Sequence, residues 1–492
     1  MTVVLVAICD VPRTPLSLLY IGNELKKAGF HVRVFDISSF EIEGTAKEIN
    51  KLNPLFVGIS TMTGLQVFHS AVMSKKIKLL NENVPVVWGG IHPTSLPKEC
   101  LSEEYLDSVV IGEGERTIVE VAKAYKGRYD LKGILGTGYK DKTGKIIVNK
   151  PRPQEKDIDN FSPDWELLDF NKAVRINKNS ISIDYQTSRG CPFKCGFCYN
   201  EQFHNRRWRK HSVPHVLDNL KKLKERSDFN EVHIIDDNFY VIPSRAIEIT
   251  DKLRELGMHP HQLKLRIEMF NEDIVRDMVK DSNCRVFTAF ESGSERILKL
   301  INKGFNKEKM RKQFEMLAKY KNSLKIDIGG IIGFPTETWE EVKESIDFAR
   351  EIGNIFPAAS INLGTYLPFP GSDLYALALQ NGFIPPERQE DWGKIDNFDM
   401  RNREEFLPWL SREKLDTYYF IDKYVKLMNH SKSTSWWRTF IKYFFHYTSN
   451  LRLKHAYFKH PFEVFTWEKF ANRQFYNPHR NVKSSFQRDF KK

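Results

Sequence analysis

The sequence is poor in cysteine and has no long apolar run. Six cysteines among 492 residues are too few for a disulfide scaffold, so we expect a reducing, cytoplasmic environment. No run of about 18 apolar residues occurs, which excludes a membrane-spanning helix. The opening segment MTVVLVAICDVP has no basic residues and meets Asp10 early. It predicts a buried strand rather than a signal peptide.

Three further absences narrow the class of protein. Internal repeats of solenoid length and low-complexity tracts are missing, and the chain is too long for one core, so we expect about three compact domains. The turn DVPRTP after the first apolar run is not G-x-G-x-x-G, so dinucleotide binding lacks its fingerprint.

Most of the net charge of +12 lies in residues 431–492, which hold 13 Lys and Arg but three Asp and Glu. The remainder is nearly neutral, which argues against a nucleic-acid surface spread over the fold.

Residues 1–135 alternate apolar runs with helical patterns. The runs that predict strands are VVLVAI, HVRVFDI, LFVGIST, PVVWGG and SVVIGEG, and segments such as LSLLYIGNELKKAGF predict the helices between them. Continuous apolar strands alternating with helices indicate a parallel sheet covered on both faces. We therefore expect an α/β, doubly wound domain of flavodoxin or Rossmann type, with its ligand at the carboxyl ends of the strands.

The rest of the chain divides into three parts. Residues 136–178 predict a small hairpin and a linker. Residues 179–385 hold six further strand patterns, ISIDYQTS, EVHIIDD, LKLRIEM, RVFTAFES, LKIDIGGII and ASINLGTYLP. Six βα units predict a (β/α)6 partial TIM barrel with its site at the carboxyl ends of the strands. Residues 386–492 predict a helical C-terminal domain.

Three of the six cysteines share one loop, SRGCPFKCGFCYN, with the spacing C-x3-C-x2-C for Cys191, Cys195 and Cys198. The alternatives are a structural zinc site, a reactive thiol pair and an iron–sulfur site. Zinc would need a fourth ligand, and the nearby His204 does not complete a usual zinc knuckle. Three thiolates leave one iron of a [4Fe-4S] cluster without a protein ligand. That open position can bind a small molecule, so the spacing favours a cluster.

With Phe197 directly before the last cysteine, the loop resembles the signature of the radical S-adenosylmethionine family. IIDDNF, FESGSERILKLINKG, GGIIGFPTET and LPFPGSDLY resemble further motifs of that family in the expected order, and the resemblance covers residues 181–375. It implies that the open iron binds the amino and carboxylate groups of S-adenosylmethionine. Reductive cleavage then yields a 5′-deoxyadenosyl radical. A flavodoxin or ferredoxin is the implied electron donor.

The same resemblance assigns contacts to S-adenosylmethionine. Its second-, fourth- and fifth-strand motifs supply, in order, Asp236, Asp237, Glu291, Ser292, Ile332, Gly333 and Pro335. These motifs would lie near the methionine amino group, the ribose and carboxylate, and the adenine, respectively. Arg266, near the end of the third strand, is a further candidate. Structural alternatives are a strand-end turn for the aspartates, an ion pair for the glutamate, and a helix capped by Thr336 or Thr338 in the fifth motif.

Segments of the N-terminal domain resemble the cobalamin-binding domain that precedes the barrel in one large class of these enzymes. The segments are TPLSLLYIGNELKKAGFHVRVFD, VVWGGIHPT and VVIGEGERT. Gly89 and Gly90 would let the backbone approach the nucleotide tail of cobalamin, and Gly112 and Glu113 would form the neighbouring loop. Ordinary β-to-α turns are the alternative for these two loops. Domains of this class can also keep the fold and lose the cofactor.

The predicted cobalt site lacks a common feature of these domains. Many carry D-x-H-x-x-G, whose histidine coordinates cobalt from below, whereas Asp10 here has no histidine two residues later. The resemblance therefore implies a lower face without a protein imidazole. His92, in GGIHPT, is the candidate substitute.

Residues 431–492 combine their positive charge with 17 aromatic residues. A helical cap on the barrel, a basic amphipathic surface on an anionic membrane, and a nucleic-acid surface all fit this composition. The membrane interpretation would place part of the protein peripherally at the inner membrane surface. It would also suggest a lipid-like substrate.

The two resemblances together imply a cobalamin-dependent radical S-adenosylmethionine enzyme. The similar group contains the anaerobic magnesium-protoporphyrin ester cyclase and many carbon methyltransferases. The implied reaction transfers a methyl group from methylcobalamin to a substrate radical at an unactivated carbon of a small-molecule or lipid-like substrate, with no nucleic-acid partner. The alternatives are a radical oxidative cyclisation or rearrangement without methyl transfer and, in another class, a zinc-stabilised nucleic-acid-binding protein.

Overall fold

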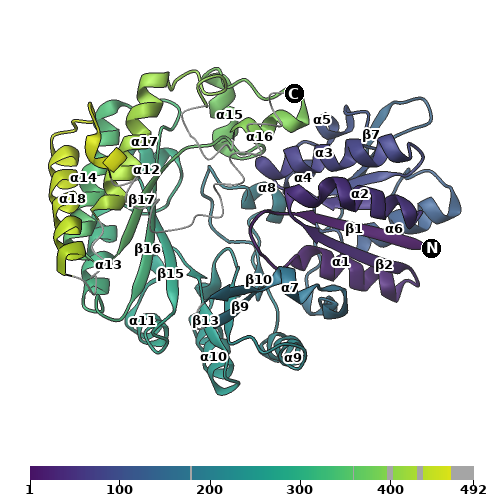
Figure 1. The fold of residues 1–492 in the computed structure, drawn as a ribbon, viewed down its shortest axis with the longest axis horizontal. Coiled ribbons are helices and arrows are strands. Elements are labelled where there is room, and N and C mark those ends of the chain that lie inside the picture. Colours follow the sequence, from purple (N-terminus) through teal and green to yellow (C-terminus); the bar gives the residue numbers. More distant parts are fainter. Residues whose placement is uncertain (178–179, 358, 396–402, 429–435, 467–492) are drawn as a thin grey trace.

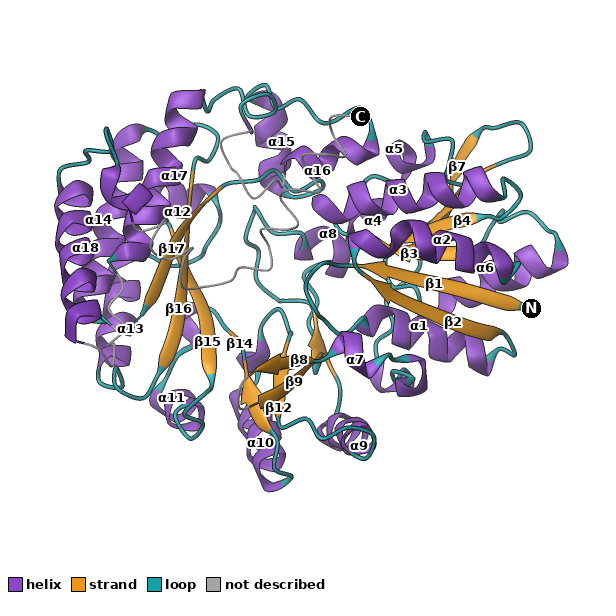
Figure 2. Cartoon of the chain, viewed as in Figure 1, coloured by secondary structure: helices purple, strands orange, loops and turns teal. Residues whose placement is uncertain are grey.

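The computed structural model describes residues 1–177, 180–357, 359–395, 403–428 and 436–466 (Figure 1). Two α/β units lie side by side, and helices of the C-terminal region cover the side of the second unit that faces away from the first (Figure 2). The carboxyl ends of strands from both units point toward the space between them, so residues at these ends can share a site.

The first unit is a seven-stranded sheet in the order β2-β1-β3-β4-β5-β6-β7. Its strands are β1 (Thr2–Ile8), β2 (His31–Ile37), β3 (Val57–Ser60), β4 (Val86–Gly89), β5 (Ser108–Val110), β6 (Thr137–Lys140) and β7 (Ile146–Val148). The first five strands are parallel, which confirms the doubly wound prediction in its flavodoxin-like order. The hairpin β6–β7 continues the sheet in antiparallel fashion.

Helices cover both faces of this sheet. They are α1 (Leu16–Lys27), α2 (Ile42–Lys51), α3 (Leu65–Leu80), α4 (Ile91–Ser95), α5 (Pro97–Leu101) and α6 (Glu115–Gly127). Val3 and Leu5 of β1 belong to one buried cluster, whereas Val4 and Val6 belong to another, and all four side chains are fully buried. Successive strand residues point to opposite faces, so the unbroken apolar run of β1 is what two covered faces require.

The second unit confirms the six-unit partial barrel. Its parallel strands are β9 (Ser180–Tyr185), β12 (Glu231–Ile234), β13 (His259–His261), β14 (Leu263–Lys264), β15 (Arg285–Glu291), β16 (Lys325–Ile332) and β17 (Ser360–Thr365). The third barrel strand differs from the prediction of residues 263–269. It is broken at Gln262, which has φ = +54°. The part before the break pairs with β12, and the part after it pairs with β15.

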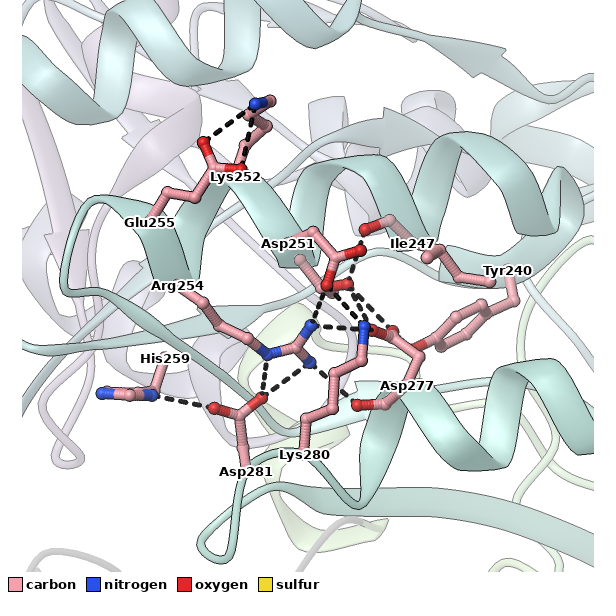
Figure 3. Close-up of polar contacts among 11 residues, drawn as sticks. Tyr240, Ile247, Asp251, Lys252, Arg254, Glu255, His259, Asp277, Lys280 and Asp281 are labelled. Atoms are coloured by element: carbon pink, nitrogen blue, oxygen red, sulfur yellow. Dashed lines mark hydrogen bonds and ion pairs between the residues drawn. The ribbon is translucent and has the colours of Figure 1, made fainter.

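Helices follow the barrel strands on the outside. They are α9 (Val213–Lys224), α10 (Pro243–Glu255), α11 (Glu272–Met278), α12 (Glu295–Leu300), α13 (Lys307–Ala318) and α14 (Trp339–Ile355). Arg254 of α10 forms ion pairs with Asp277 and Asp281 at 2.8 and 2.7 Å (Figure 3). Tyr240 also donates to Asp277, at 2.9 Å. This buried network fixes α10 against α11 at the outer surface.

Short elements and C-terminal helices complete the described chain. They are α7 (Phe170–Ala173), β8 (Arg175–Asn177), β10 (Ser188–Arg189), α8 (Asn200–His204), β11 (Arg209–Lys210), α15 (Asp373–Gln380), α16 (Trp392–Ile395), α17 (Arg412–Leu427) and α18 (Trp436–Lys454). The helical C-terminal prediction is thus confirmed, although residues 431–435 and 467–492 of the basic tail lie outside the described residues. None of the helices described is long and apolar enough to cross a membrane.

Candidate functional site

A cavity of about 530 Å³ lies between the two units. From the first unit it is lined by Gly89, Gly90, Gly112 and Glu113, which are the four residues that the cobalamin resemblance placed at strand ends. From the barrel it is lined by, among others, Tyr199, Asp237, Gln262 and Lys264. One space is therefore open to both the predicted cobalamin loops and the predicted S-adenosylmethionine site.

The loop at Gly90 has no room for a side chain. Gly90 has φ = +106°, and a Cβ there would lie 2.6 Å from the carbonyl oxygen of Thr61. Gly112 also has a positive φ, +78°, and its N–H donates to Thr94 Oγ1 at 2.9 Å. These two turns bring bare backbone to the wall of the cavity, which fits a bulky cofactor that approaches closely.

The cysteine loop follows β9 and β10 and is fixed at its middle. Gly196 donates to the Ile301 carbonyl at 2.9 Å and accepts from the Leu374 N–H at 2.8 Å. All six cysteines of the chain are free thiols, and the three in this loop are partly buried. Burial raises the pKa of Cys198 to about 12, whereas a metal-bound thiol is deprotonated. Three partly buried thiols on one anchored loop fit a cluster with one open iron.

The two aspartates after β12 face different surroundings. Asp236 is fully buried and accepts three bonds, from the Thr187 N–H and hydroxyl and from the Ser188 hydroxyl, at 2.5–2.7 Å. Burial raises its pKa despite these bonds. Asp237 lines the cavity and accepts from Tyr199 Oη at 2.7 Å and from the Gly190 N–H at 3.2 Å. Asp236 therefore holds the strand end, and Asp237 connects the cavity to the cysteine loop.

Arg266 lies directly on the cysteine loop. Its Nη1 is 2.9 Å from Cys195 Sγ, and its guanidinium carbon lies 4.0 Å from the centre of the Phe193 ring. It also donates to the Lys303 carbonyl and to Glu268. The charge beside the Cys195 sulfur and the contact with the Phe193 ring hold Arg266 against the cysteine loop.

The two residues assigned from the fourth-strand motif, Glu291 and Ser292, make contacts in different places. Glu291 has φ = +64° and pairs with Lys303 at 2.8 Å, and both side chains are buried. Left-handed backbone at a glutamate is strained and is common at functional sites. Ser292 instead turns toward α14, where its Oγ lies 3.1 Å from Ser345 Oγ and accepts from the Ser294 N–H. Phe197, in the cysteine loop, is partly buried and packs on the main core.

The loop after β16 is held by Trp409 and by hydrogen bonds within the loop. Ile332, Gly333 and Pro335 are buried, and Trp409 Nε1 donates to the Gly333 carbonyl at 3.0 Å. Glu337 accepts from the N–H groups of Gly333 and Phe334. Thr338 caps α14 in a capping box with Glu341, so the capping alternative holds for this residue.

Replacing Glu337 by glutamine should remove part of the pH dependence of stability. Burial raises the pKa of Glu337 to about 7, so the folded chain retains a proton there that the unfolded chain has lost. Stability therefore falls as pH rises from about 4.5 to 7, by up to about 3 kcal/mol from this group. Urea denaturation at pH 4.5 and pH 8 measures this loss, which Glu337→Gln should lack. The exposed neighbour Glu340, changed to glutamine, is the control, and equal slopes for wild type and Glu337→Gln would contradict the prediction.

His92 follows Gly90 and Ile91, which line the cavity, but does not line it itself. Its ring is fully buried, with Nε2 2.7 Å from Gln389 Oε1 and Nδ1 3.1 Å from Thr63 Oγ1. The ring of Trp392 packs edge-on against it at 5.4 Å. Burial lowers its pKa to about 4, so the ring is neutral and both nitrogens are engaged. This geometry corrects the interpretation of His92 as a substitute cobalt ligand, because its ring joins the first unit to residues 389–392.

His92→Ala should therefore leave the paramagnetic resonance spectrum of bound cobalamin unchanged. The variant should lose about 1–3 kcal/mol of stability, because Gln389 is left buried without its partner. Electron paramagnetic resonance of the cobalt and urea denaturation measure the two effects. Loss of a nitrogen splitting in the variant would show instead that this ring reaches the metal.

A buried ion-pair network joins the cavity to the cysteine loop. Glu113 pairs with Arg209 at 2.7 Å and with Arg189 at 3.3 Å, and Arg189 pairs with Glu115 at 2.7 Å. Although burial opposes ionisation, the Arg209 hydrogen bonds and the Arg189 charge hold the pKa of Glu113 below its usual value. Sequence reasoning missed both arginines. The only signal was the position of Arg189 two residues before Cys191.

Comparisons with known proteins agree with this arrangement. The B12 binding domain model matches residues 3–122, and the radical SAM superfamily model matches residues 185–349. An uncharacterized methyltransferase of Pyrococcus horikoshii is 33% identical over 391 residues, which cover 78% of this chain and 82% of the relative. The anaerobic magnesium-protoporphyrin IX monomethyl ester cyclase of Rubrivivax gelatinosus is 25% identical, with 83% of this chain and 72% of the relative covered. The cobalamin-dependent S-adenosylmethionine radical enzyme OxsB, solved with aqua-cobalamin, shares the fold with a TM-score of 0.67 at 16% identity, covering 96% of this chain and 75% of that one.

The chain belongs to the radical S-adenosylmethionine superfamily, in the class of enzymes that carry an N-terminal B12-binding domain. The cofactors of this class are a [4Fe-4S] cluster, S-adenosylmethionine and cobalamin. Membership in this class decides against the zinc-stabilised nucleic-acid-binding alternative.

Proposed function

We propose that the protein methylates a carbon atom of a small-molecule substrate within the cavity between the two units. The observation that carries this proposal is the shared cavity, which is lined by Gly90 and Gly112 on one side and by Asp237 and Gln262 on the other. The relative from Pyrococcus horikoshii named as a methyltransferase supports the same reaction. When bound, the cluster and S-adenosylmethionine supply a carbon-centred radical, and cobalamin supplies the methyl group.

The chain itself positions these reactants and excludes water. Cys191, Cys195 and Cys198 would hold the cluster, and Arg266 places a positive charge beside one of the sulfurs. Glu291, in its strained backbone and paired with Lys303, is the residue of the fourth motif that we assign to S-adenosylmethionine. Asp237, Ile332, Gly333 and Pro335 would shape the nucleoside site, whereas Asp236 and Ser292 make contacts within the fold. Burial between the two units raises the effective concentration of the reacting groups.

The test is anaerobic reconstitution of the full chain with cluster and cobalamin, reduction by a flavodoxin or ferredoxin, and addition of S-adenosylmethionine with an isotope-labelled methyl group. We expect a cell extract to yield both 5′-deoxyadenosine and a product that carries the labelled methyl group, detected by mass spectrometry. Formation of 5′-deoxyadenosine with an oxidised, unlabelled product would overturn methyl transfer. That result would support the cyclisation alternative. The similarity to the cyclase of Rubrivivax gelatinosus is the reason to test for it.

We also propose that α18 contacts an anionic lipid surface. Phe444, Tyr447 and Leu451 follow the spacing of one helix face and are exposed, and Lys454 and Lys459 nearby are exposed as well. An aromatic face beside lysines favours the headgroup zone of an anionic bilayer. Wild type should sediment with anionic vesicles, and Phe444→Ser with Tyr447→Ser should weaken this. Equal sedimentation of both proteins, or equal sedimentation with neutral vesicles, would contradict the proposal.

A further inference from the structure

Three potential metal ligands outside the cysteine loop converge on β12 and β13. Glu231 and His233 lie two residues apart on β12, so they point to the same face of the strand. His261 of β13 is the direct neighbour of His233 in the parallel register. One ligand atom from each of the three side chains lies within 4.8 Å of the other two. The alternate residues of β12, Val232 and Ile234, are buried in the main core.

Two ring nitrogens in this group have unused hydrogen-bonding capacity. His233 Nε2 and His261 Nδ1 are buried and have no hydrogen-bond partner within the part of the chain that the structure describes. An unsatisfied buried polar atom costs about 1–3 kcal/mol. By contrast, in the group of Asp159, His211 and His215, both nitrogens of His211 have partners, Asp159 at 3.0 Å and Tyr20 at 3.3 Å. That group has one such nitrogen, His215 Nε2, whereas the group on β12 and β13 has two.

An arginine and an aspartate lie beside His233. Its Nδ1 accepts from Arg175 Nη1 at 2.9 Å and lies 3.5 Å from Asp184 Oδ1, and the arginine pairs with both oxygens of that aspartate. Coordination through Nε2 needs the proton on Nδ1, so metal binding would turn Nδ1 from Arg175 to Asp184, as in carboxylate–histidine–metal arrangements.

We propose that Glu231, His233 and His261 bind one divalent transition-metal ion such as Zn²⁺. Two imidazoles and one carboxylate leave a fourth position for water, which is a common ligand set for this ion. Ligand atoms around tetrahedral zinc lie about 3.3 Å apart, so ligand atoms that lie within 4.8 Å of one another close by at most about 1.5 Å on binding. The ion joins β12 to β13 next to the break at Gln262, where the third barrel strand has only three residues to pair with β12. The site lies beside the wall of the cavity, which Gln262, Asp184 and Arg175 line, but the proposal does not rest on the proposed methyl transfer.

The test uses the full chain with its cluster in place, dialysed against Zn²⁺ and analysed for zinc and iron. We expect one zinc per chain in addition to the cluster iron, with Glu231→Gln and His261→Ala binding Zn²⁺ at least about 10-fold more weakly. His259→Ala is the matched control on the same strand, because His259 turns to Asp281 at 2.8 Å (Figure 3). It should retain zinc.

Two further measurements guard against misfolding and against zinc on the cysteine loop. Zn²⁺ should raise the Tm of wild type and His259→Ala but not that of Glu231→Gln, which nearly preserves side-chain shape. A full-length variant with Cys191, Cys195 and Cys198 all changed to alanine should still bind zinc. Absence of zinc from wild type, its loss from the triple variant, or unchanged affinity in both Glu231→Gln and His261→Ala would overturn the proposal.

Discussion

Replacing Cys195 by alanine should lower the rate of 5′-deoxyadenosine formation by at least about 1000-fold and remove most of the bound iron. The remaining two thiols cannot satisfy the three irons that a cubane presents to the protein. The change also leaves the Arg266 guanidinium, now 2.9 Å from the sulfur, without that partner. Iron and sulfide analysis of anaerobically reconstituted protein, with chromatography of 5′-deoxyadenosine, measures both losses.

Cys284→Ala is the matched control for this prediction. Cys284 is buried in the main core, far along the chain from the loop. Its replacement should cost some stability through a small cavity but leave the iron content and the rate of nucleoside formation close to wild type. A Cys195→Ala protein that still carries a full cluster and cleaves S-adenosylmethionine would contradict the assignment of the loop.

The elements that could be predicted are those whose sequence patterns are local. An unbroken apolar run such as Val3–Val6 has few alternatives to a strand buried on both faces, and the three cysteines lie within eight residues of one another. The family resemblance then ordered the remaining motifs. Which side chains reach the cavity was harder to predict, because neighbouring strand-end residues point in different directions. Asp236 and Asp237 looked equivalent, yet only the second lines the cavity.

Long-range contacts account for the main differences between the predictions and the structure. The partner of His92 is Gln389, 297 residues away, so no local pattern could indicate that its ring was already engaged. The third barrel strand was misplaced because LKLRIEM alternates like a strand, whereas His259–Pro260–His261 contains a proline, which is uncommon inside sheets. In the structure Arg266 leaves the strand to contact Cys195. The strand ends at Lys264, two residues before this contact.

Glu113→Ala should destabilise the fold by about 3–5 kcal/mol. Glu113, Arg189 and Arg209 have side chains that are only 11%, 7% and 8% exposed, and removing the carboxylate leaves two arginines buried with too little compensating charge. Because Glu113 belongs to the first unit and both arginines belong to the segment around the cysteine loop, the loss should appear as earlier separation of the two units. Urea denaturation monitored by circular dichroism measures the change.

Glu120→Ala separates this effect from the loss of any ion pair. Glu120 pairs with Arg152 at 2.7 Å, but its side chain is 44% exposed, so its removal should cost less than about 1 kcal/mol. If Glu113→Ala costs no more than Glu120→Ala, the network does not hold the units together. If Glu113→Ala shows the larger loss, cobalamin affinity should weaken in parallel, because Glu113 lines the cavity while fixing the segment that leads into Cys191. One carboxylate would then set both the shape of the cobalamin loop and the position of the cluster loop.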